Sequence, residues 1–379
     1  MKRLILVFNA GSATLKFKVF EEKNLKEKIA GNFERIGLSD SFLIINKKKW
    51  SFGGIDSHEK ALRIILKNIG LKTREIKVIG HRVVHGGEEF FKPTVVTTTI
   101  LKKISKYNHL APLHNPANLE VARACFKIFP KVKNVAVFDT DFFASLKPEQ
   151  YLYGLPLGLC RRLKIRKYGF HGISHQYIAS AASQLLKKPL KKLNLITCHL
   201  GNGCSIVAIK NGKPVETSMG FTPLEGLVMG TRSGDIDPTL PLFLQNELGL
   251  KSGQVSDLLN NKSGLLGLSG FSSDMREILK ASGYPVKNYH GRKKFSFQEK
   301  KRSKLALAVF TNRLRFYLAG YAGLLGKVEA IVFTGGIGER SEVVRRLALN
   351  GLKFIKKPKI LAIDANEELE IAREIKGLI

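Results

Sequence analysis

Apolar and polar positions follow two periods along this chain, one typical of strands and one of helices. The apolar run Leu4–Phe8 predicts a buried strand, and the alternation across residues 15–20 predicts a second strand after a short glycine loop. The run Leu195–Leu200 and the segment Cys204–Ile209 repeat this strand, loop and strand about half a chain later. We interpret the repeat as an internal duplication, which predicts two related α/β halves facing each other across a cleft, each with one phosphate-binding hairpin.

Helical periodicity separates and follows the two hairpins. The predicted helices are His58–Asn68, Ile100–Lys106, Pro116–Phe126, His175–Leu186, Pro241–Leu248, Ser252–Leu259, Ser272–Leu279, about Phe297–Leu324, and Asn366–Lys376. Further strands are predicted at Val135–Phe138, Ala330–Thr334 and Lys359–Asp364. Ala330–Thr334 leads into glycine-rich residues 335–338, and Ser341 is the predicted N-cap of the next helix. A strand, a glycine turn and a helix N-terminus in this order favour a nucleotide site.

The bulk composition limits the class of protein. A length of 379 residues favours two domains, with a boundary near residues 141–152, and an apolar content of 44% excludes global disorder. The four cysteines form no CxxC pair, so we expect reduced thiols and a cytoplasmic protein. No apolar run has the length of a signal-peptide core or a membrane span, so we expect no membrane partner.

Net charge is the most unusual bulk property, because 63 Lys and Arg residues stand against only 31 Asp and Glu, giving +32. Such a balance can indicate nucleic-acid binding. The lysines are dispersed in pairs and triplets, such as Lys47–Lys49 and Lys191–Lys192, and they rarely alternate with aromatic residues. We therefore expect a solvated basic surface that helps to attract anionic substrates, and no specific nucleic-acid partner.

Six glycine-rich or charged motifs carry the chemistry of phosphate binding. They are NAGSATLKF from Asn9, GHRVVHGGE from Gly80, VFDT from Val137, YGFHGISH from Tyr168, HLGNGCS from His199 with MGTRSGDIDP from Met229, and VFTGGIGERS from Val332. Glycines let backbone amides approach a ligand, while Arg, His, Asp and Asn side chains bind phosphate, carboxylate and Mg²⁺. Because the chain has no GxxxxGK[ST] loop, the pattern predicts a phosphoryl-transfer enzyme outside the P-loop class.

These motifs resemble those of the acetate kinase (acetokinase) family, as do APLHNP from Ala111, YLYGLP from Tyr151, FTPLEG from Phe221, SSDMRE from Ser272 and NEELEIARE from Asn366. The match covers essentially the whole chain. The resemblance implies the superfamily of sugar kinases, actin and heat-shock chaperone ATPases, with two duplicated actin-like (ribonuclease H-like) α/β domains and a nucleotide cleft between them. It also implies reversible, Mg²⁺-ATP-dependent phosphorylation of acetate to acetyl phosphate by direct in-line transfer, with Mn²⁺ as an alternative metal and ATP or ADP as co-substrate.

The resemblance further implies boundaries and residue roles. The first domain is expected at residues 1–145 with the C-terminal helix 368–379, and the second, at 146–367, is expected to bind nucleotide and form a homodimer. The implied catalytic residues are Asp139, His171 and Arg232, and the implied substrate-binding residues are Arg82, Val84, Leu113, Phe170 and Pro223. The implied nucleotide-binding residues are Ser12, Lys16, His199, Leu200, Gly201, Asn202, Gly203, Asp274, Met275, Arg276, Gly336, Ile337, Gly338, Glu339 and Arg340. The implied metal ligands are Asn9 and Glu367.

Five positions depart from the pattern usual in that family. Ala13 and Thr14 stand where NAGSSSLKF has serines, Asp141 and Phe143 stand where VFDTAFH has alanine and histidine, and Arg340 replaces the asparagine of GIGEN. Thr14 keeps a hydroxyl, so the phosphate contacts are expected to survive. An added acid two residues after the catalytic aspartate is expected to alter local pKa values or anion binding.

The chemistry needs no strong base, because a carboxylic acid with a pKa of about 4–5 is already ionised at pH 7. Arg82 and Arg232 suit planar oxyanions, and their glycine neighbours favour that role over a surface ion pair. We expect Asp139 to orient Arg82 or a metal-bound water, with a helix cap as the alternative. The alternative for Asn9 is a turn, and for Glu367 a favourable acid in the first turn of a helix.

Three other functions stay open on sequence alone. A propionate or butyrate kinase would share every motif, although Val84 and Pro223 favour a small acyl pocket. A nucleotide switch like actin or a chaperone ATPase would hydrolyse ATP without an acyl acceptor, and would not need Arg82, Arg232 and His171 together. A basic nucleic-acid binder would show a clustered basic face and salt-dependent binding.

Overall fold

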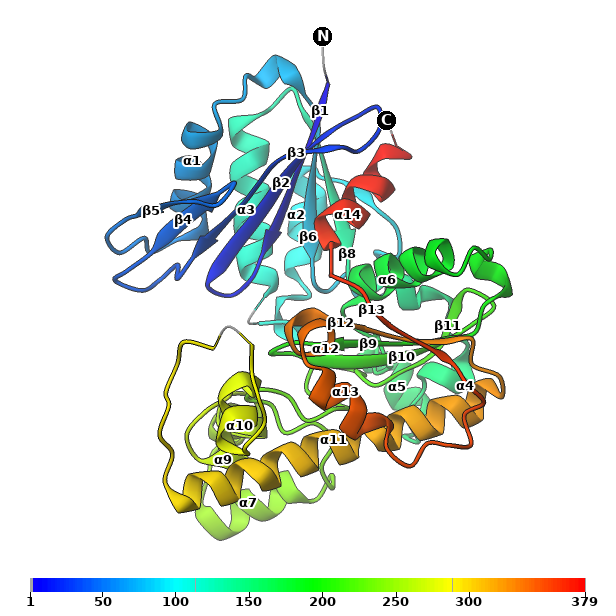
Figure 1. The fold of residues 1–379 in the computed structure, drawn as a ribbon. Helices are drawn as coiled ribbons and strands as arrows, with labels where there is room; N and C mark the ends of the chain where they lie inside the picture. Colours follow the sequence, from blue (N-terminus) through cyan, green and yellow to red (C-terminus); the bar gives the residue numbers. More distant parts are fainter. Residues whose placement is uncertain (1–2, 113, 288, 379) are drawn as a thin grey trace. The chain divides into compact units, whose positions relative to one another are not determined.

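The structure is a computed structural model that describes residues 3–112, 114–287 and 289–378. The chain divides into two compact units (Figure 1). Unit 1 comprises Met1–Ala144, His171–Tyr177 and Asn366–Ile379, and unit 2 comprises Ser145–Phe170 and Ile178–Ala365. The structure therefore groups residues 171–177 with unit 1, whereas the sequence assigned them to the second domain.

Unit 1 is built on an eight-stranded sheet in the order β5-β4-β3-β2-β1-β6-β8-β7. Its strands are β1 (Leu4–Ala10), β2 (Thr14–Glu21), β3 (Glu27–Glu34), β4 (Phe42–Ile45), β5 (Lys48–Ser51), β6 (Ile76–Val83), β7 (Thr94–Val95) and β8 (Lys133–Phe138). Strands β1 to β5 pair antiparallel in sequence order, whereas β6 runs parallel to β1, and β8 parallel to β6. The carboxyl ends of β1, β6 and β8 therefore meet at one edge of the sheet.

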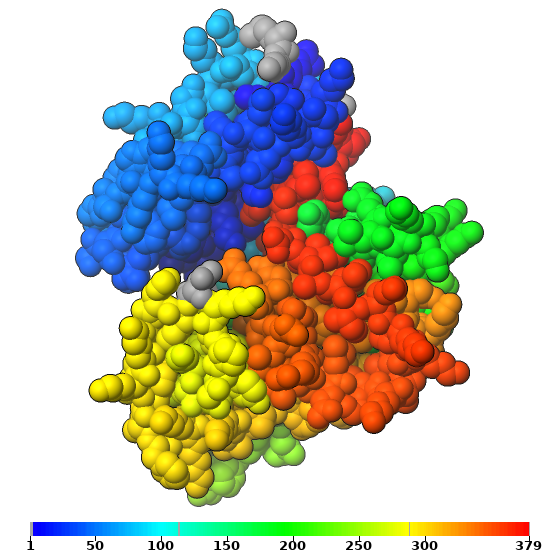
Figure 2. Space-filling view, viewed as in Figure 1, coloured from blue at the N-terminus to red at the C-terminus, as the bar shows by residue number. Residues whose placement is uncertain are grey.

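Helices cover both faces of this sheet. They are α1 (His58–Ile69), α2 (Thr98–Ser105), α3 (Asn115–Ile128), α14 (Glu367–Lys376) and the first residues of α6 (Gly172–Leu185). On one face α1 and α3 pack with Phe8 and Phe17, and on the other Ile371 and Ile375 of α14 pack with Val7. Because both faces are covered, every residue of β1 is buried. Figure 2 shows the C-terminal segment (red) against the N-terminal part of the chain (blue), so both ends of the sequence build unit 1.

Unit 2 contains a five-stranded sheet in the order β11-β10-β9-β12-β13. Its strands are β9 (Leu195–Leu200), β10 (Cys204–Lys210), β11 (Lys213–Thr217), β12 (Ala330–Thr334) and β13 (Lys359–Ala362). Its helices include α4 (Pro148–Tyr151), α5 (Leu157–Leu163), α7 (Leu240–Leu248), α8 (Ser252–Asn261), α9 (Gly264–Ser269), α10 (Met275–Ala281), α11 (Phe297–Leu325), α12 (Gly335–Arg340) and α13 (Glu342–Leu349). The long helix α11 begins at a capping box, in which Ser296 and Glu299 each accept the other's backbone N–H.

The two units share one topology. In each, three consecutive strands pair antiparallel in the order third, second, first, and two later strands continue the sheet in parallel from the first. The glycine loops at residues 11–13 and 201–203 join the first two strands of each set. This arrangement confirms the two related α/β halves that the repeated hairpin predicted.

Most predicted elements are present, with ends shifted by a few residues. The helix predicted from Ser272 begins at Met275, because the Ser272 hydroxyl accepts the Asp274 N–H at 3.0 Å and Asp274 is the N-cap. Strands β3 to β5 were not predicted: they lie at the outer side of the sheet, and every residue of β5 is exposed, so no apolar period marks it. Within the described ranges, no helix combines the length and apolarity that crossing a membrane requires.

Candidate active site

Three polar side chains stand where the parallel strands of unit 1 end. Asn9 and Arg82 are the penultimate residues of β1 and β6, and Asp139 directly follows β8. The strand register aligns these ends with one another. Carboxyl ends of parallel strands are where α/β sheets bind ligands. The structure therefore brings together two residues predicted for substrate and metal and one predicted for catalysis.

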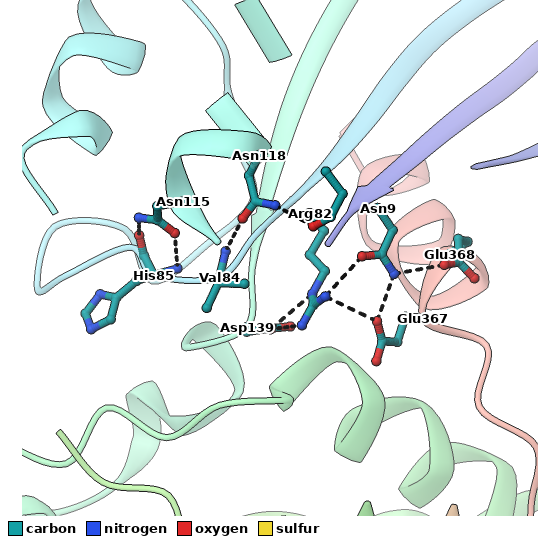
Figure 3. A network of polar contacts seen from close by, with 10 residues as sticks. Asn9, Arg82, Val84, His85, Asn115, Asn118, Asp139, Glu367 and Glu368 are labelled. Atoms are coloured by element: carbon teal, nitrogen blue, oxygen red, sulfur yellow. Dashed lines mark hydrogen bonds and ion pairs between the residues drawn. The ribbon is translucent and has the colours of Figure 1, made fainter. Parts of the chain in front are cut away.

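Arg82 lies at the centre of this group (Figure 3). Its Nε and Nη2 donate to Asp139 Oδ2 at 3.1 and 2.5 Å, and its Nη1 donates to Asn9 Oδ1 at 3.0 Å. Three of the five guanidinium N–H groups are engaged in these bonds, which leaves two for a substrate anion. Burial acts to lower the pKa of Arg82, but Asp139 and Glu367 raise it more, so Arg82 stays a cation.

Asp139 is almost completely buried, with 1% of its surface exposed. Its N–H donates to Val83 O at 3.0 Å, which fixes the residue at the end of β8. Burial raises the pKa of Asp139 to about 6, against the opposing effect of Arg82, so the carboxylate is mostly ionised at pH 7. Its Oδ1 has no hydrogen-bond partner within the described part of the chain. A buried carboxylate oxygen of this kind is suited to a water or a metal ion.

Asn9 ties the end of β1 to the first turn of α14. Its Nδ2 donates to Glu367 Oε2 and to Glu368 Oε1, both at 2.9 Å (Figure 3). Asn366, the N-cap of α14, accepts a bond from Lys18 Nζ at 3.1 Å. The sequence predicted Asn9 and Glu367 but missed Glu368 and Lys18. The consecutive acids after Asn366 were the available signal.

The unit 1 residues fit the way proteins usually bind Mg²⁺. That ion prefers oxygen ligands, and it is commonly held by one or two carboxylates together with waters and substrate phosphates. Asp139 supplies a buried oxygen without a partner, and Glu367 lies 3.9 Å from the same guanidinium. Over the described residues, no set of three His, Cys, Asp or Glu side chains forms a metal site by itself. Asn9 Oδ1 accepts one hydrogen bond from Arg82, and its second lone pair is the one that a metal ion would use.

His171 is positioned through the backbone of Asp139. Its φ of +57° is left-handed, an uncommon conformation for a residue other than glycine. The next residue, Gly172, donates its N–H to Asp139 O at 3.1 Å, and a Cβ on Gly172 would lie 2.0 Å from that oxygen. Only glycine therefore allows this approach. Strained backbone of this kind concentrates at functional sites.

Two asparagines of α3, which the sequence analysis missed, hold the segment after β6. Asn118 accepts the Val84 N–H at 3.1 Å and donates to Ala10 O at 2.7 Å. Asn115 accepts the His85 N–H and donates to His85 O, both at 3.0 Å. These bonds fix the backbone that carries Val84, a residue predicted to line the acyl pocket (Figure 3). Their signal was the NPAN pattern, which places two asparagines on one face of a helix.

In unit 2 many predicted nucleotide residues fall in two glycine loops at one sheet edge. Strands β9 and β12 are parallel, and His199 lies opposite Thr334, so the turn at residues 201–203 and the start of α12 are neighbours. Gly335 has a φ of +76°, and a Cβ there would lie 2.6 Å from Leu200 O. Such close, glycine-dependent approach leaves room for backbone N–H groups to contact a phosphate.

Arg232 lies in the long loop between β11 and α7. This loop is joined to the glycine turn of β9 and β10, because Gly230 N donates to Asn202 O at 2.9 Å. The guanidinium has two long contacts, from Nη1 to Pro223 O at 3.4 Å and to Met229 Sδ at 4.0 Å. In the described chain no carboxylate is paired with it, and burial lowers its pKa. A buried cation without an acid is unfavourable unless an anion binds beside it.

The remaining residues predicted to bind nucleotide differ in whether their side chains are exposed to solvent. Ser12 and Lys16 are exposed near the turn between β1 and β2, whereas Leu200 and Met275 are buried, so only their backbone can reach a ligand. Asp274 caps α10 and pairs with Arg276. The rest are His199 in β9, Gly201, Asn202 and Gly203 in the loop that follows it, and Gly336, Ile337, Gly338, Glu339 and Arg340 in α12.

The predicted acyl-pocket residues lie in both units. Val84 belongs to unit 1, Phe170 and Pro223 belong to unit 2, and Leu113 falls outside the described residues. Tyr153 supports the segment around Pro223, because its hydroxyl donates to Glu225 and accepts the Phe221 N–H at 2.7 Å.

Two of the unusual residues, Asp141 and Phe143, lie beside the Asp139 turn. Phe143 is buried and contacts the His175 ring edge-on, with 6.5 Å between the ring centroids, so it is a core residue. Burial raises the pKa of Asp141 to about 6, with Lys92 opposing the shift. Burial, Asp141 and Glu370 raise the pKa of Glu374 in α14 to about 8. The added acid therefore disfavours the ionisation of Glu374.

Comparison with known proteins identifies the family of the whole chain. The profile of the acetokinase family matches residues 4–373. An acetate kinase from Geobacillus kaustophilus is 43% identical over 404 aligned positions, which cover 99% of this chain and 98% of that protein. Solved structures of an acetate kinase from Porphyromonas gingivalis and a propionate kinase from Francisella tularensis superpose with TM-scores of 0.86 and 0.87. Each is 36% identical to this chain, and each match covers 98% of both chains.

These matches confirm the resemblance and the fold class predicted from the motifs. Because the family profile and a relative above 40% identity both span nearly the whole sequence, the protein is a kinase with the two-domain, actin-like α/β fold of those structures, and the chain belongs to the acetokinase family.

Proposed function

We propose that this enzyme transfers the γ-phosphoryl group of Mg²⁺-ATP reversibly to acetate, giving acetyl phosphate by direct in-line displacement. The observation that carries the proposal is the network at the strand ends of unit 1, where Arg82 is held by Asp139 and Asn9 and keeps two N–H groups for a carboxylate. A planar guanidinium matches a carboxylate in shape and charge.

The proton balance of this reaction needs no general base. Acetate is already ionised at neutral pH. Asp139, whose pKa burial raises to about 6, is mostly ionised as well. Its Oδ2 fixes Arg82, and its unpartnered Oδ1 and the Glu367 carboxylate suit a metal ion bound to the ATP phosphates. When bound, that ion would neutralise phosphate charge. Asp139 therefore orients Arg82 and neither takes a proton from the substrate nor gives one to it.

Arg232 and His171 are the proposed stabilisers of the transition state. In phosphoryl transfer, negative charge spreads over three equatorial oxygens, and cations aimed at them lower the barrier. Arg232 is a partly buried cation whose side-chain contacts with the described residues are long. His171 is held in a strained conformation beside the Asp139 backbone. Long contacts are expected of a cation that completes its interactions with substrate, and strained backbone is typical of functional sites.

The acyl substrate is proposed to be acetate because Val84 is buried and its backbone N–H is held by Asn118, which favours a small acyl pocket. A propionate kinase is among the similar structures, so longer acids must be tested. Each added methylene changes binding by about 1 kcal/mol, so propionate should also react.

The test is acyl-phosphate formation from ATP with acetate, propionate and butyrate in parallel, trapped as the hydroxamate, with and without Mg²⁺. We expect kcat/KM to be higher for acetate than for butyrate, and no product without a divalent metal. ATP hydrolysis without acid is measured alongside. Higher kcat/KM for butyrate would refute the small pocket, and hydrolysis that ignores added acid would favour a nucleotide switch.

We further propose a cytoplasmic homodimer formed through unit 2. The four cysteines are buried and free, as in a reducing compartment. Helices α7 and α11 carry exposed apolar side chains, among them Leu242 (60% exposed), Phe243 (56%) and Phe316 (66%). Exposed apolar groups of this size are typical of interfaces. Light scattering at micromolar concentration should give twice the chain mass, and a monomer there would refute the proposal.

A further inference from the structure

The loop that carries Arg232 is irregular but closely held. It covers residues 218–235, between β11 and α7, and we call it the Arg232 loop. Residues 226–230 and 234 of this loop are buried although they form no helix or strand. Its fixed conformation must therefore come from specific hydrogen bonds and not from secondary structure.

Asp235 joins the two sides of this loop. Its backbone N–H donates to Gly226 O at 3.0 Å, and its Oδ1 accepts the Gly226 N–H at 2.7 Å. Its other oxygen, Oδ2, accepts the hydroxyl of Tyr317 at 2.6 Å. Tyr317 belongs to α11, so one carboxylate links the base of the loop to the longest helix of unit 2.

The connection from Asp235 to Arg232 is short and stiff. Gly234 between them has a φ of +71°, and a Cβ there would lie 2.6 Å from Gly226 O, so the two sides of the loop are in close contact. The Met229 N–H donates to Arg232 O at 3.1 Å. Because the backbone is packed this closely, a shift of Asp235 must be passed on to Arg232 three residues before it.

The Tyr317 hydroxyl is a dependable donor. Burial, followed by the bond to Asp235, raises the pKa of Tyr317 well above its ordinary value, so the hydroxyl stays protonated across the neutral range. The bond to an ionised carboxylate is of the charge-assisted kind, which is shorter and stronger than a neutral hydrogen bond.

We propose that Tyr317 and Asp235 form a positioning pair, which holds the Arg232 loop against α11 and so sets the place of the Arg232 guanidinium. The inference rests on the catalytic role proposed for Arg232. Tyr317 acts through Arg232 and contacts no substrate. The pair explains how an arginine with only long side-chain contacts of its own is kept in one position.

The test variant is Tyr317→Phe, which removes one hydroxyl and keeps the ring. Its matched control is Tyr321→Phe, one turn further along α11, because the buried Tyr321 hydroxyl has no hydrogen-bond partner among the described residues. Displacements of about 1 Å can cost on the order of 100-fold in rate. We expect Tyr317→Phe to lower kcat by about 10- to 100-fold with little change in KM for ATP, and Tyr321→Phe to change kcat less than about twofold.

A double-mutant cycle separates positioning from general damage. In the Arg232→Ala background, adding Tyr317→Phe should change the remaining kcat by less than about twofold, because the side chain that it positions is gone. Hydrogen exchange of residues 226–235 should be faster in Tyr317→Phe than in wild type or Tyr321→Phe. Equal kcat in wild type and Tyr317→Phe, or an undiminished effect in the Arg232→Ala background, would overturn the inference. Failure of the proposed function would instead be seen in the wild type, as no acyl phosphate from any acid.

Discussion

Replacing Arg232 with alanine should separate catalysis from stability more clearly than any other change. Its guanidinium makes two long contacts with the described residues, at 3.4 and 4.0 Å, so the variant loses about one weak hydrogen bond, or about 1 kcal/mol. Removing a partly desolvated cation that has no acid partner among the described residues also relieves an unfavourable desolvation, which offsets that loss. The net change in the free energy of unfolding should therefore be within about 1 kcal/mol.

The effect on the reaction should be far larger. An arginine facing the phosphoryl group in the transition state contributes about 10³-fold or more in kcat, or roughly 4 kcal/mol. Because this contribution arises only in the transition state, the KM and the calorimetric affinity for ATP should change little. Arg232→Lys keeps the charge but loses the planar fork, so its kcat should lie between those of wild type and Arg232→Ala.

The assay is kcat and KM for ATP and acetate, with thermal unfolding and ATP calorimetry on the same samples. Arg161→Ala is the control, because Arg161 is an exposed arginine of the same unit. If Arg232→Ala retains at least a third of the wild-type kcat, the catalytic role of Arg232 is wrong. If kcat falls only together with a large drop in unfolding temperature, the arginine is structural.

Two further changes test unit 1. Asp139→Asn should lower kcat and also destabilise the fold by about 3 kcal/mol, because Arg82 would lose the partner of its buried ion pair. An Asp139→Asn variant with an unchanged unfolding temperature would contradict this expectation. The second change is Glu374→Gln. In the folded state the pKa of Glu374 is raised from 4.5 to about 8 by burial, Asp141 and Glu370, and the hydrogen bond to Gln176 opposes this shift. A raised carboxyl pKa stabilises the fold at low pH and loses that contribution as pH rises from about 4.5 to about 8. The Glu374→Gln variant should therefore have a higher unfolding temperature than wild type at pH 8.5 and no such advantage at pH 5, which a calorimetric pH series would measure. An equal shift of unfolding temperature at both pH values would refute the raised pKa of Glu374.

The sequence predicted those parts of the fold that leave a local pattern. The repeated hairpin at Leu4–Phe8 and Leu195–Leu200 was sufficient to predict the two α/β halves, because a buried strand next to a glycine loop can be recognised from a few consecutive residues. Strand β5 was missed because its four residues are all exposed and carry no apolar period. The start of α10 was displaced because Ser272 and Asp274 are both possible N-caps, and only the folded turn decides between them.

In the candidate site, too, the side chains that stand in a local sequence pattern were predictable and the others were not. Asn9 and Asp139 follow predicted strands, so their meeting could be predicted from the strand ends, whereas the strand β6 that carries Arg82 was not predicted. The groups that support the neighbouring backbone could not be predicted, because Asn118 is 108 positions after its partner Ala10 and Tyr317 is 82 positions after its partner Asp235. Nothing in the neighbourhood of Tyr317 distinguishes it from Tyr321, which lies on the same buried face of α11 and has no partner for its hydroxyl among the described residues. A hydrogen bond between distant segments depends on how two elements pack, and packing is a property of the whole unit. Residues that act on the substrate are thus more predictable from sequence than residues that position them, and the Tyr317 and Tyr321 variants compare a proposed positioning residue with a neighbouring tyrosine that has no such role on the same helix.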